Sequence, residues 1–373
     1  MKTSYILKTI LFTMLITVMA IFMESCEMPA TGFDGEEEAI YYSKHQKSDA
    51  PVPDSTIRVM TWNMRFGIGR GSWFGDACGD RVIYSEKEIL DKLKSIVEHI
   101  NLVNPDVLLL QEVDINSTRS AYVDQLRWIL DRTAFNYAAY GLQWKAQFIP
   151  SDGLGRIEEA NAIMSRWPIT DAKRIQLVLR KDQDGLTRYF YERCCMVKAK
   201  INIPDFKSFY AVNIHASAFA TDDSKHKHLL EFKNLLDGIS SSGIRFVAGG
   251  DLNTLPPGSD STDYCIEDMC PGESFHHPGD NPQHKEGSNY SPESEWLLPF
   301  YNAYKSAVPL SVYLANQESY FTHTTRPYFF WDRTLDYLFT NYHWRNGSVI
   351  THQDFFEDSD HAPVSAEFAL ERN

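Results

Sequence analysis

The stretch Ile57-Arg-Val-Met-Thr-Trp-Asn-Met64 is rich in β-favouring residues and predicts a strand. Residues 85–88, Ser-Glu-Lys-Glu, form a capping box, and the apolar residues between Ile89 and Ile100 have the spacing of a helix with one buried face. Asn104-Pro105 ends that helix, and residues 106–110, Asp-Val-Leu-Leu-Leu, predict a fully buried strand. A strand, a helix and a second strand in this order indicate an α/β fold.

The second half of the chain repeats this alternation. Residues 209–214 and 244–248 predict strands, and the apolar residues between Leu229 and Ile239 predict a helix between them. Closing strands are expected at residues 334–340 and 363–370. Because no linker divides this pattern, we predict one α/β domain over residues 56–373.

Three further stretches are candidates for substrate-binding loops. Residues 256–299 are rich in Pro, Gly, Ser, Asp and His and are too many for a plain connection, so they are either functional or disordered. Residues 67–81 contain Trp73 and Phe74. Aromatic runs at residues 320–321 and 328–331 add apolar surface, although core packing explains most of these side chains more simply.

The first 26 residues predict an export signal of the lipoprotein type. Lys2 and Lys8 precede an apolar run over residues 10–23 that is too short for a comfortable membrane span. The run ends in Ser25-Cys26, which resembles a bacterial lipoprotein processing site, although Glu24 departs from the usual small residue. We therefore expect an exported protein of the cell envelope, anchored to a membrane through a lipidated Cys26. Cleavage nearby, which would leave a secreted protein, is the alternative.

Residues 27–55 contain three consecutive glutamates and few large apolar residues, so we expect a flexible acidic tether. The whole chain carries a net charge of −14, which argues against tight non-specific binding to nucleic acid but not against phosphoester chemistry. Hydrophobic residues make up 43% of the chain, as in a packed globular protein, and we expect a monomer.

The cysteines are not expected to perform the chemistry. Cys265 and Cys270 could close a small disulfide loop in an oxidising compartment. The adjacent Cys194 and Cys195 are expected as buried thiols in a strand.

Polar residues recur where the predicted strands end. They are Asn63, Gln111-Glu112, His215, Asp251 with Asn253, and Asp360-His361. Burying so many ionisable groups is costly unless they share a purpose. Their carboxylate and amide oxygens would suit a hard cation such as Mg²⁺.

Each of these signals is weak when taken alone. Glu112 could be a solvated strand edge, and His215 a structural histidine. Asp251 and Asn253 could form an Asx turn. Asp360-His361 could cap the last strand, and Asp336 could be a salt-bridge partner in the core. Their occurrence together and in this order is the informative observation.

Taken together, the motifs resemble the endonuclease/exonuclease/phosphatase family, which includes pancreatic-type deoxyribonuclease. The resemblance covers nearly the whole predicted domain and implies a four-layered α/β sandwich, in which two mixed β-sheets pack face to face and helices lie outside. The motifs that carry it are Thr61-Trp62-Asn63, Pro105-Asp106-Val107 through Gln111-Glu112-Val113, Asn161-Ala-Ile-Met-Ser165-Arg166, Val212-Asn-Ile-His215, Gly250-Asp251-Leu252-Asn253, Leu335-Asp336-Tyr337 and Ser359-Asp360-His361-Ala-Pro363.

The resemblance implies roles for the metal-binding and water-activating residues. Glu112 looks like the principal metal ligand, with Asn63 beside it and Asp360 as a further ligand. The ion would be Mg²⁺, with Mn²⁺ or Ca²⁺ as alternatives, and would act as a Lewis acid on the phosphate. Asp251 resembles the residue that orients or deprotonates the attacking water, and Asn253 would hold a phosphate oxygen or the nucleophile.

The resemblance also implies roles for the histidines. His361 would hydrogen-bond the phosphate. Asp336 would orient a catalytic imidazole, for which His361 is the first choice. His215 would flank the phosphate from the other side, as a donor or general acid.

This chain departs from the family pattern around residues 156–159. Glu158 or Glu159 could approach the site and pair a histidine, and Arg156 could contact phosphate. An exposed charged hairpin explains these three residues equally well.

The sequence therefore predicts a metal-dependent phosphoesterase that acts outside the cytoplasm on a phosphodiester or phosphomonoester. Its substrate could be a small molecule, a lipid headgroup or a nucleic acid, because variable loops rather than motifs select it. A secreted nuclease is the alternative within this class. A non-enzymatic binding protein on the same scaffold is the alternative from another class, but such a protein would be expected to lack Glu112, Asp251 or His361.

Overall fold

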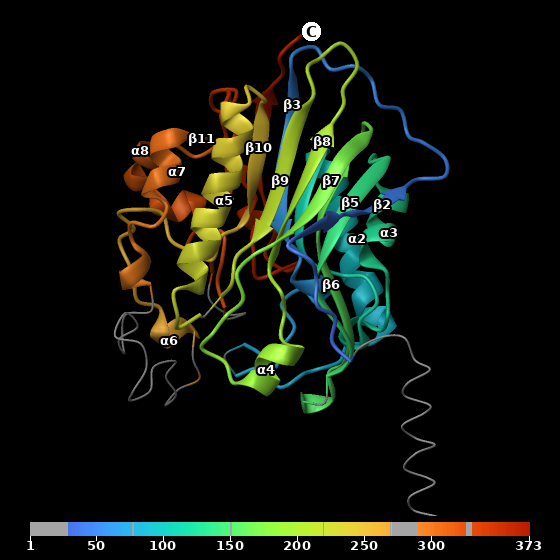
Figure 1. The fold of residues 1–373 in the computed structure, drawn as a ribbon, viewed down its shortest axis with the longest axis vertical. Coiled ribbons are helices and arrows are strands. Elements are labelled where there is room, and N and C mark those ends of the chain that lie inside the picture. Colours follow the sequence, from blue (N-terminus) through green and yellow to red (C-terminus); the bar gives the residue numbers. More distant parts are fainter. Residues whose placement is uncertain are drawn as a thin grey trace, which may run out of the picture.

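The computed structural model describes residues 29–373 except 77, 150, 219, 269, 271–289 and 326–329. Its centre is a pair of seven-stranded sheets with helices outside (Figure 1). Sheet A consists, in spatial order, of β13 (Ile350–Thr351), β14 (Val364–Ala369), β3 (Thr56–Asn63), β4 (Val107–Asp114), β6 (Gly155–Ser165), β5 (Tyr137–Ile149) and β2 (Ile40–Ser43). Sheet B consists of β1 (Glu36–Glu38), β7 (Ile169–Gln176), β8 (Cys195–Ile201), β9 (Phe209–His215), β10 (Phe246–Asp251), β12 (Asp336–Thr340) and β11 (Lys305–Ser306).

Alternating side chains of the central strands face the two sides of each sheet. In β4, Val107 and Leu109 join the core between the sheets, whereas Leu108 and Leu110 join the core under the helices. The inner core also includes Val197 of β8 from sheet B. Both faces of β4 are therefore buried, which explains its continuous apolar run.

Helices cover the outer face of each sheet (Figure 1). On sheet A, α2 (Glu86–Val103) and α3 (Gln125–Arg132) pack against β3 and β4, and on sheet B, α5 (Ser224–Ser241) and α7 (Leu298–Ala303) pack against β9 and β10. The predicted four-layered α/β sandwich is confirmed. The remaining α-helices of the described residues are α4 (Gly185–Phe190), α6 (Cys265–Asp268) and α8 (Leu310–Ala315).

Each sheet contains one pair of parallel strands joined by a helix. In sheet A, β3 pairs in parallel with β4 through α2, and in sheet B, β9 pairs in parallel with β10 through α5. Parallel strands end at the same edge of a sheet, so polar residues at their carboxyl ends are brought together. This arrangement positions the residues of the candidate site.

One prediction about the periphery is wrong. The expected tether is partly ordered, because β1 pairs with β7 and β2 pairs with β5, and Ala39 between them is buried. Backbone pairing at two sheet edges holds a segment whose composition alone would leave it flexible.

The Cys265–Cys270 disulfide that the sequence allowed does not form. Cys270 is bonded to Cys78, which lies 192 residues away, and Cys265 is free. Cys194 and Cys195 are buried thiols as predicted, with Cys195 opening β8 and Cys194 immediately before it.

No helix among the described residues is long and apolar enough to cross a membrane. The predicted export signal and Cys26 lie outside the described residues.

The capping box at the start of α2 is formed as predicted. The Ser85 backbone N–H donates to Glu88 Oε2 at 2.9 Å, and the Ser85 hydroxyl accepts from the Glu88 backbone N–H. We expect Ser85→Ala to lower the free energy of unfolding by about 1 kcal/mol, because the Glu88 backbone N–H in the first turn loses its side-chain acceptor. Urea denaturation measures this change.

The matched control is Lys94→Ala, an exposed position in the same helix. This substitution should change the free energy of unfolding by less than about 0.5 kcal/mol. Equal destabilisation by the two substitutions would show that the cap does not stabilise α2.

Candidate active site

Strand register places three predicted site residues side by side in sheet B. Asp251, at the end of β10, is the register partner of His215 on β9 and of Asp336 on β12. Gly250, directly before Asp251, has φ +133°, and a Cβ there would lie 2.0 Å from the Ile214 carbonyl oxygen. Only glycine therefore fits where β10 lies this close to β9.

Sheet A contributes Asn63 and Glu112. Asn63 ends β3 as predicted, but Glu112 does not follow its strand, because β4 continues to Asp114. The pairing of β4 with β6 shifts register between Leu110 and Val113, and Glu112 has φ +53°. A β-bulge of this kind bends the strand and turns a side chain away from its regular direction.

Asn63 connects the two sheets at the site. Its amide nitrogen donates to Glu112 Oε1 at 2.8 Å and to Asp251 Oδ2 at 3.1 Å. Its oxygen accepts from the Arg65 backbone N–H at 3.0 Å. In this arrangement Asn63 holds two carboxylates together, and the amide would have to turn over to offer its oxygen to a metal.

The predicted pairing of Asp336 with His361 is present. His361 Nδ1 lies 2.8 Å from Asp336 Oδ2, and both residues are buried. Burial alone would lower the pKa of His361, but Asp336 and Asp251 raise it to about 10. His361 is therefore an imidazolium at neutral pH. Its Nε2 lies 3.6 Å from Asp251 Oδ2, too far for a good hydrogen bond, so this N–H remains available to a ligand.

His215 faces Asp251 from the opposite side. Its Nε2 lies 3.5 Å from Asp251 Oδ2 and 3.7 Å from Glu112 Oε1. Burial alone would lower the pKa of His215, but Asp251 and Glu112 raise it above the usual value. Gln143 Nε2 lies 3.0 Å from His215 Nδ1, and a hydrogen bond from this amide nitrogen would leave the imidazole N–H at Nε2.

Gln143 links His215 to two further carboxylates. Its amide nitrogen also contacts Glu159 Oε1 at 2.8 Å and Glu192 Oε2 at 3.2 Å. Glu159 thus reaches a histidine through Gln143 rather than directly, and its burial rules out the exposed-hairpin interpretation for this residue. Arg156 pairs with Glu158 and does not line the cleft.

Asn253 forms the Asx turn that its spacing allowed and also lines the cleft. Its backbone N–H donates to Asp251 Oδ1 at 2.9 Å, and its side-chain amide donates to the Ala216 carbonyl at 2.9 Å. Its φ of +50° places it in the left-handed region, where Asn is tolerated. The turn fixes the orientation of the Asp251 carboxylate.

Asp360 lies beside a cation. Its Oδ2 is 3.1 Å from Arg65 Nε, and Arg65 also pairs with Asp76. Burial alone would raise the pKa of Asp360, but Arg65 and His361 lower it below the usual value. Asp360 is therefore ionised at neutral pH.

These residues line one cleft of about 400 Å³. Seven of the eight predicted site residues are close to it or line it directly: Glu112, His215, Asp251, Asn253, Asp360 and His361 line it, and Asn63 bonds two of these. Trp73 and Phe74 of the predicted loop 67–81 form part of its wall, and Asp268 and Tyr290 come from the predicted loop 256–299. Residues 271–289 of that loop lie outside the described residues.

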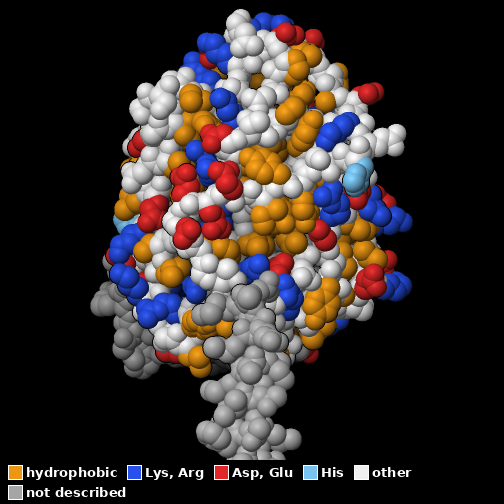
Figure 2. All heavy atoms as spheres, turned by 45° about the vertical axis from the view of Figure 1, so that its right-hand side comes forward, with side chains coloured by type: hydrophobic (Ala, Val, Ile, Leu, Met, Phe, Trp, Pro, Cys, Tyr) orange, Lys and Arg blue, Asp and Glu red, His pale blue; other side chains and the backbone are white. Residues whose placement is uncertain are grey.

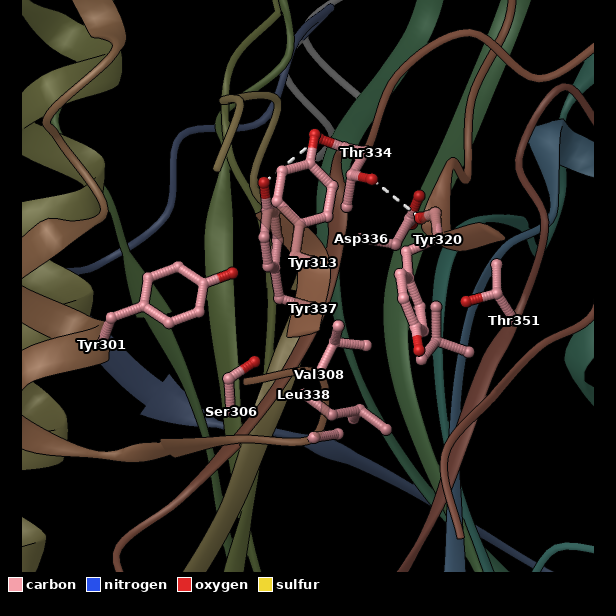
Figure 3. A pocket seen from close by; sticks show the side chains of 12 residues that line it. Tyr301, Ser306, Val308, Tyr313, Tyr320, Thr334, Asp336, Tyr337, Leu338 and Thr351 are labelled. Atoms are coloured by element: carbon pink, nitrogen blue, oxygen red, sulfur yellow. Dashed lines mark hydrogen bonds between the residues drawn. The ribbon is translucent and has the colours of Figure 1, made fainter. Parts of the chain in front are cut away.

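Asp336 instead lines a separate small cavity of about 20 Å³ (Figure 3). Tyr313, Tyr320 and Tyr337 surround this cavity, so Tyr320 of the predicted aromatic runs lies here and not in the cleft. Residues 328 and 329 of those runs lie outside the described residues. Asp336 therefore supports His361 from behind and does not face the cleft itself.

The chemistry of the cleft fits a divalent metal. Burial raises the pKa of Glu112 to about 7, and Glu159 and Asp360 add to this effect against the opposing charge of His215. A carboxylate so surrounded by negative charge favours a bound cation. Among the described residues, the ligand atoms of Asp251, Asp336 and His361, and those of His323, Asp360 and His361, also lie within 4.8 Å of one another. The predicted set Asn63, Glu112 and Asp360 stays a prediction.

Comparison with known proteins agrees with this geometry. Residues 60–361 match the Endonuclease/Exonuclease/phosphatase family. The chain belongs to this family. The family includes metal-dependent phosphoesterases, nucleases and phosphatases. No curated protein matched the chain.

Several solved structures are similar to this chain at low sequence identity. An endonuclease/exonuclease/phosphatase from Beutenbergia cavernae is 18% identical, with a TM-score of 0.55 over 85% of this chain and 72% of that chain. The human nocturnin catalytic domain with bound sulfate is 16% identical (TM-score 0.45; 89% and 97% covered). A 3′ phosphatase from Neisseria, bound to a product DNA hairpin, is 16% identical (TM-score 0.47; 84% and 99% covered).

The family motifs left several residues of the cleft unpredicted. Arg65, Arg119, Gln143, Glu192 and His323 all contact or line the site. Arg65 could have been found, because it follows Asn63 by two residues at a strand end. Gln143 and Glu192 lie outside the motifs, and only the packing of β5 against β8 brings them to His215.

The Asp336–His361 pair yields a prediction for this member of the family. We expect Asp336→Asn to lower the pKa of His361 from about 10 toward 6.5 or below. Burial disfavours the charged imidazolium, and the variant lacks the Asp336 carboxylate that stabilises it. In the wild type, the raised pKa of His361 adds to the free energy of unfolding. This contribution is largest below about pH 6.5 and is lost as pH rises through about 10. NMR titration of the imidazole measures the pKa.

Asp131→Asn, at an exposed position on α3, is the control and should leave the His361 titration unchanged. An unaltered His361 pKa in Asp336→Asn would mean that Asp336 does not hold the proton on this imidazole.

Proposed function

We propose that the chain is a divalent-metal-dependent hydrolase of phosphoric esters that acts outside the cytoplasm. The observation that carries this proposal is the convergence of Glu112, Asp251 and His361 in one cleft. They come from a bulge, a strand end and a loop that lie far apart in sequence. A binding protein on this scaffold would have no need to keep all three. Mg²⁺ suits the oxygen-rich surroundings of Glu112 best.

Asp251 is the group that would activate the attacking water. Asn63 and Asn253 each donate one hydrogen bond to it, which fixes the carboxylate but leaves lone pairs for a water proton. His215 and His361 place two N–H groups within 3.6 Å of its Oδ2. A water beside this oxygen would therefore be oriented toward a phosphate held between the two imidazoles.

The two histidines would hold the phosphate from opposite sides. His361 is positively charged and offers Nε2–H, so it would stabilise negative charge on a phosphate oxygen as the attack proceeds. His215 offers Nε2–H near Glu112 and would donate to the leaving oxygen. A metal bound by Glu112, with Asn63 and Asp360 as further ligands, would act as the Lewis acid that neutralises the phosphate.

The cleft favours a substrate with one phosphoester group over a polynucleotide. Among the described residues, the two arginines that line the cleft are already ion-paired, Arg65 with Asp360 and Asp76, and Arg119 with Asp114 and Glu159. Binding along a nucleic-acid strand needs cations that remain available to successive phosphates. On the face shown in Figure 2, basic side chains are interspersed with acidic and hydrophobic ones. We therefore propose a small phosphoester or a lipid headgroup as the substrate.

A hydrolysis panel tests this function. It should contain aryl phosphate mono- and diesters, sphingomyelin, inositol phosphates, DNA and RNA, each with Mg²⁺ and with EDTA. We expect hydrolysis that requires the metal, and a kcat/KM that Glu112→Gln and His361→Asn each lower by about 10²–10³-fold. Glu98→Gln, an exposed position on α2, is the control.

Retention of wild-type activity by both site variants would refute the assignment of the site. A preference for DNA or RNA over every small ester would favour the nuclease alternative. Inactivity on the whole panel would favour a binding protein.

The proposed location outside the cytoplasm has a separate test. Mass spectrometry of the mature protein should find a diacylated Cys26 at the N-terminus, and Cys26→Ser should release the protein from the membrane fraction. An unmodified N-terminus close to this position would instead mean ordinary cleavage and secretion.

A further inference from the structure

His323 lies at the edge of the cleft, next to Asp360 and His361, and the proposed function gives it no role. Its backbone pairs with that of His361 in antiparallel fashion. Two backbone hydrogen bonds flank this pair: the Ala362 N–H donates to the Thr322 carbonyl at 2.6 Å, and the Thr324 N–H donates to the Asp360 carbonyl at 3.2 Å. The two segments therefore form a short antiparallel pair. It fixes the His323 and His361 rings 4.4 Å apart, centre to centre.

The ligand atoms of His323, Asp360 and His361 lie within 4.8 Å of one another. Two atoms that bind one tetrahedral ion with bonds of about 2.1 Å are about 3.4 Å apart, so small side-chain movements would bring all three onto one ion. Two imidazoles and one carboxylate are the ligand set of a transition metal, whereas Mg²⁺ prefers oxygen.

The hydrogen bonds around the two imidazoles leave one nitrogen of each for a metal. Thr325 donates its hydroxyl hydrogen to Asp268, so its oxygen can accept from His323 Nε2, which lies 3.4 Å away. His323 Nδ1 is buried and has no hydrogen-bond partner among the described residues, which is costly for a polar atom. His361 donates Nδ1–H to Asp336 and leaves Nε2. A carboxylate behind a ligating histidine is typical of zinc sites.

We propose that His323, Asp360 and His361 form a second metal site, which takes a transition-metal dication such as Zn²⁺ and shares only Asp360 with the ligands proposed for Mg²⁺ at Glu112. Binding forms a bond from the metal to His361 Nε2 and releases the proton of that nitrogen to water. The site has three protein ligands, so a fourth position stays open to water.

This site has a regulatory consequence that rests on the proposed function. A metal on His361 Nε2 removes the N–H that would hold the phosphate, and it also engages Asp360. Zn²⁺ would therefore inhibit the Mg²⁺-supported hydrolysis.

Binding of Zn²⁺ itself tests the site without any substrate. The mature protein, prepared without a histidine tag, is titrated with Zn²⁺ by calorimetry in excess Mg²⁺, and with Co²⁺ by visible absorption. We expect one Zn²⁺ per chain, and at least about ten-fold weaker binding in His323→Gln. His45→Gln, at an exposed position far along the chain from the site, is the matched control and should bind as the wild type does.

Wild-type affinity in His323→Gln, or no Zn²⁺ binding by the wild type in excess Mg²⁺, would overturn the proposal. If His323→Gln does not fold, the anomalous signal of Zn²⁺ in crystals of the wild type decides. A peak between His323 and His361 supports the site, and peaks only elsewhere contradict it. Because none of these readouts needs hydrolysis, Zn²⁺ binding by an inactive protein would refute the proposed function alone.

Discussion

The structure depends on hydrogen bonds that join the two sheets directly beneath the cleft. Gln111 Nε2 donates to Asn213 Oδ1 at 2.6 Å, and Asn213 Nδ2 donates to the carbonyls of Leu110 and Ala162 at 2.7 and 2.8 Å. These groups are fully buried beside the largely apolar core between the sheets. Apolar contacts would tolerate sliding of one sheet over the other, whereas buried amides left without partners would be costly. The relative position of the sheets is thereby fixed where the site needs it.

The electrostatics of the cleft follow from this arrangement, because each sheet brings its own carboxylates to the same place. Most of them have a cationic partner: Asp360 has Arg65, Glu159 has Arg119, and Asp336 has His361. Glu112 has no such partner close by among the described residues. Its partners are the neutral Asn63 and the more distant His215. Burial and the nearby carboxylates of Glu159 and Asp360 raise its pKa. A divalent cation at Glu112 is the simplest way to balance the site.

The walls of the cleft come from loops that the sheets do not organise. Asp76 and Asp268 line it from different loops, and two residues beyond each of them lies a cysteine of the Cys78–Cys270 disulfide. The bond therefore joins the two loops beside the cleft. Such a link removes conformational freedom from two segments that few apolar contacts would hold. It also explains why loops of irregular composition can form a defined wall.

The sequence by itself determined the alternation of strands and helices and the family motifs. Local periodicity predicted the strands and helices. The family motifs named seven residues that lie at or beside the cleft, and His361 as the first choice of partner for Asp336. Tertiary structure decided the rest. The bulge that turns Glu112, the partnership of Gln143 with His215, the Cys78–Cys270 bond and the proximity of His323 to His361 all arise between segments distant in sequence. The physical reason is that register and sheet packing set these contacts, and neither is encoded in local residue spacing.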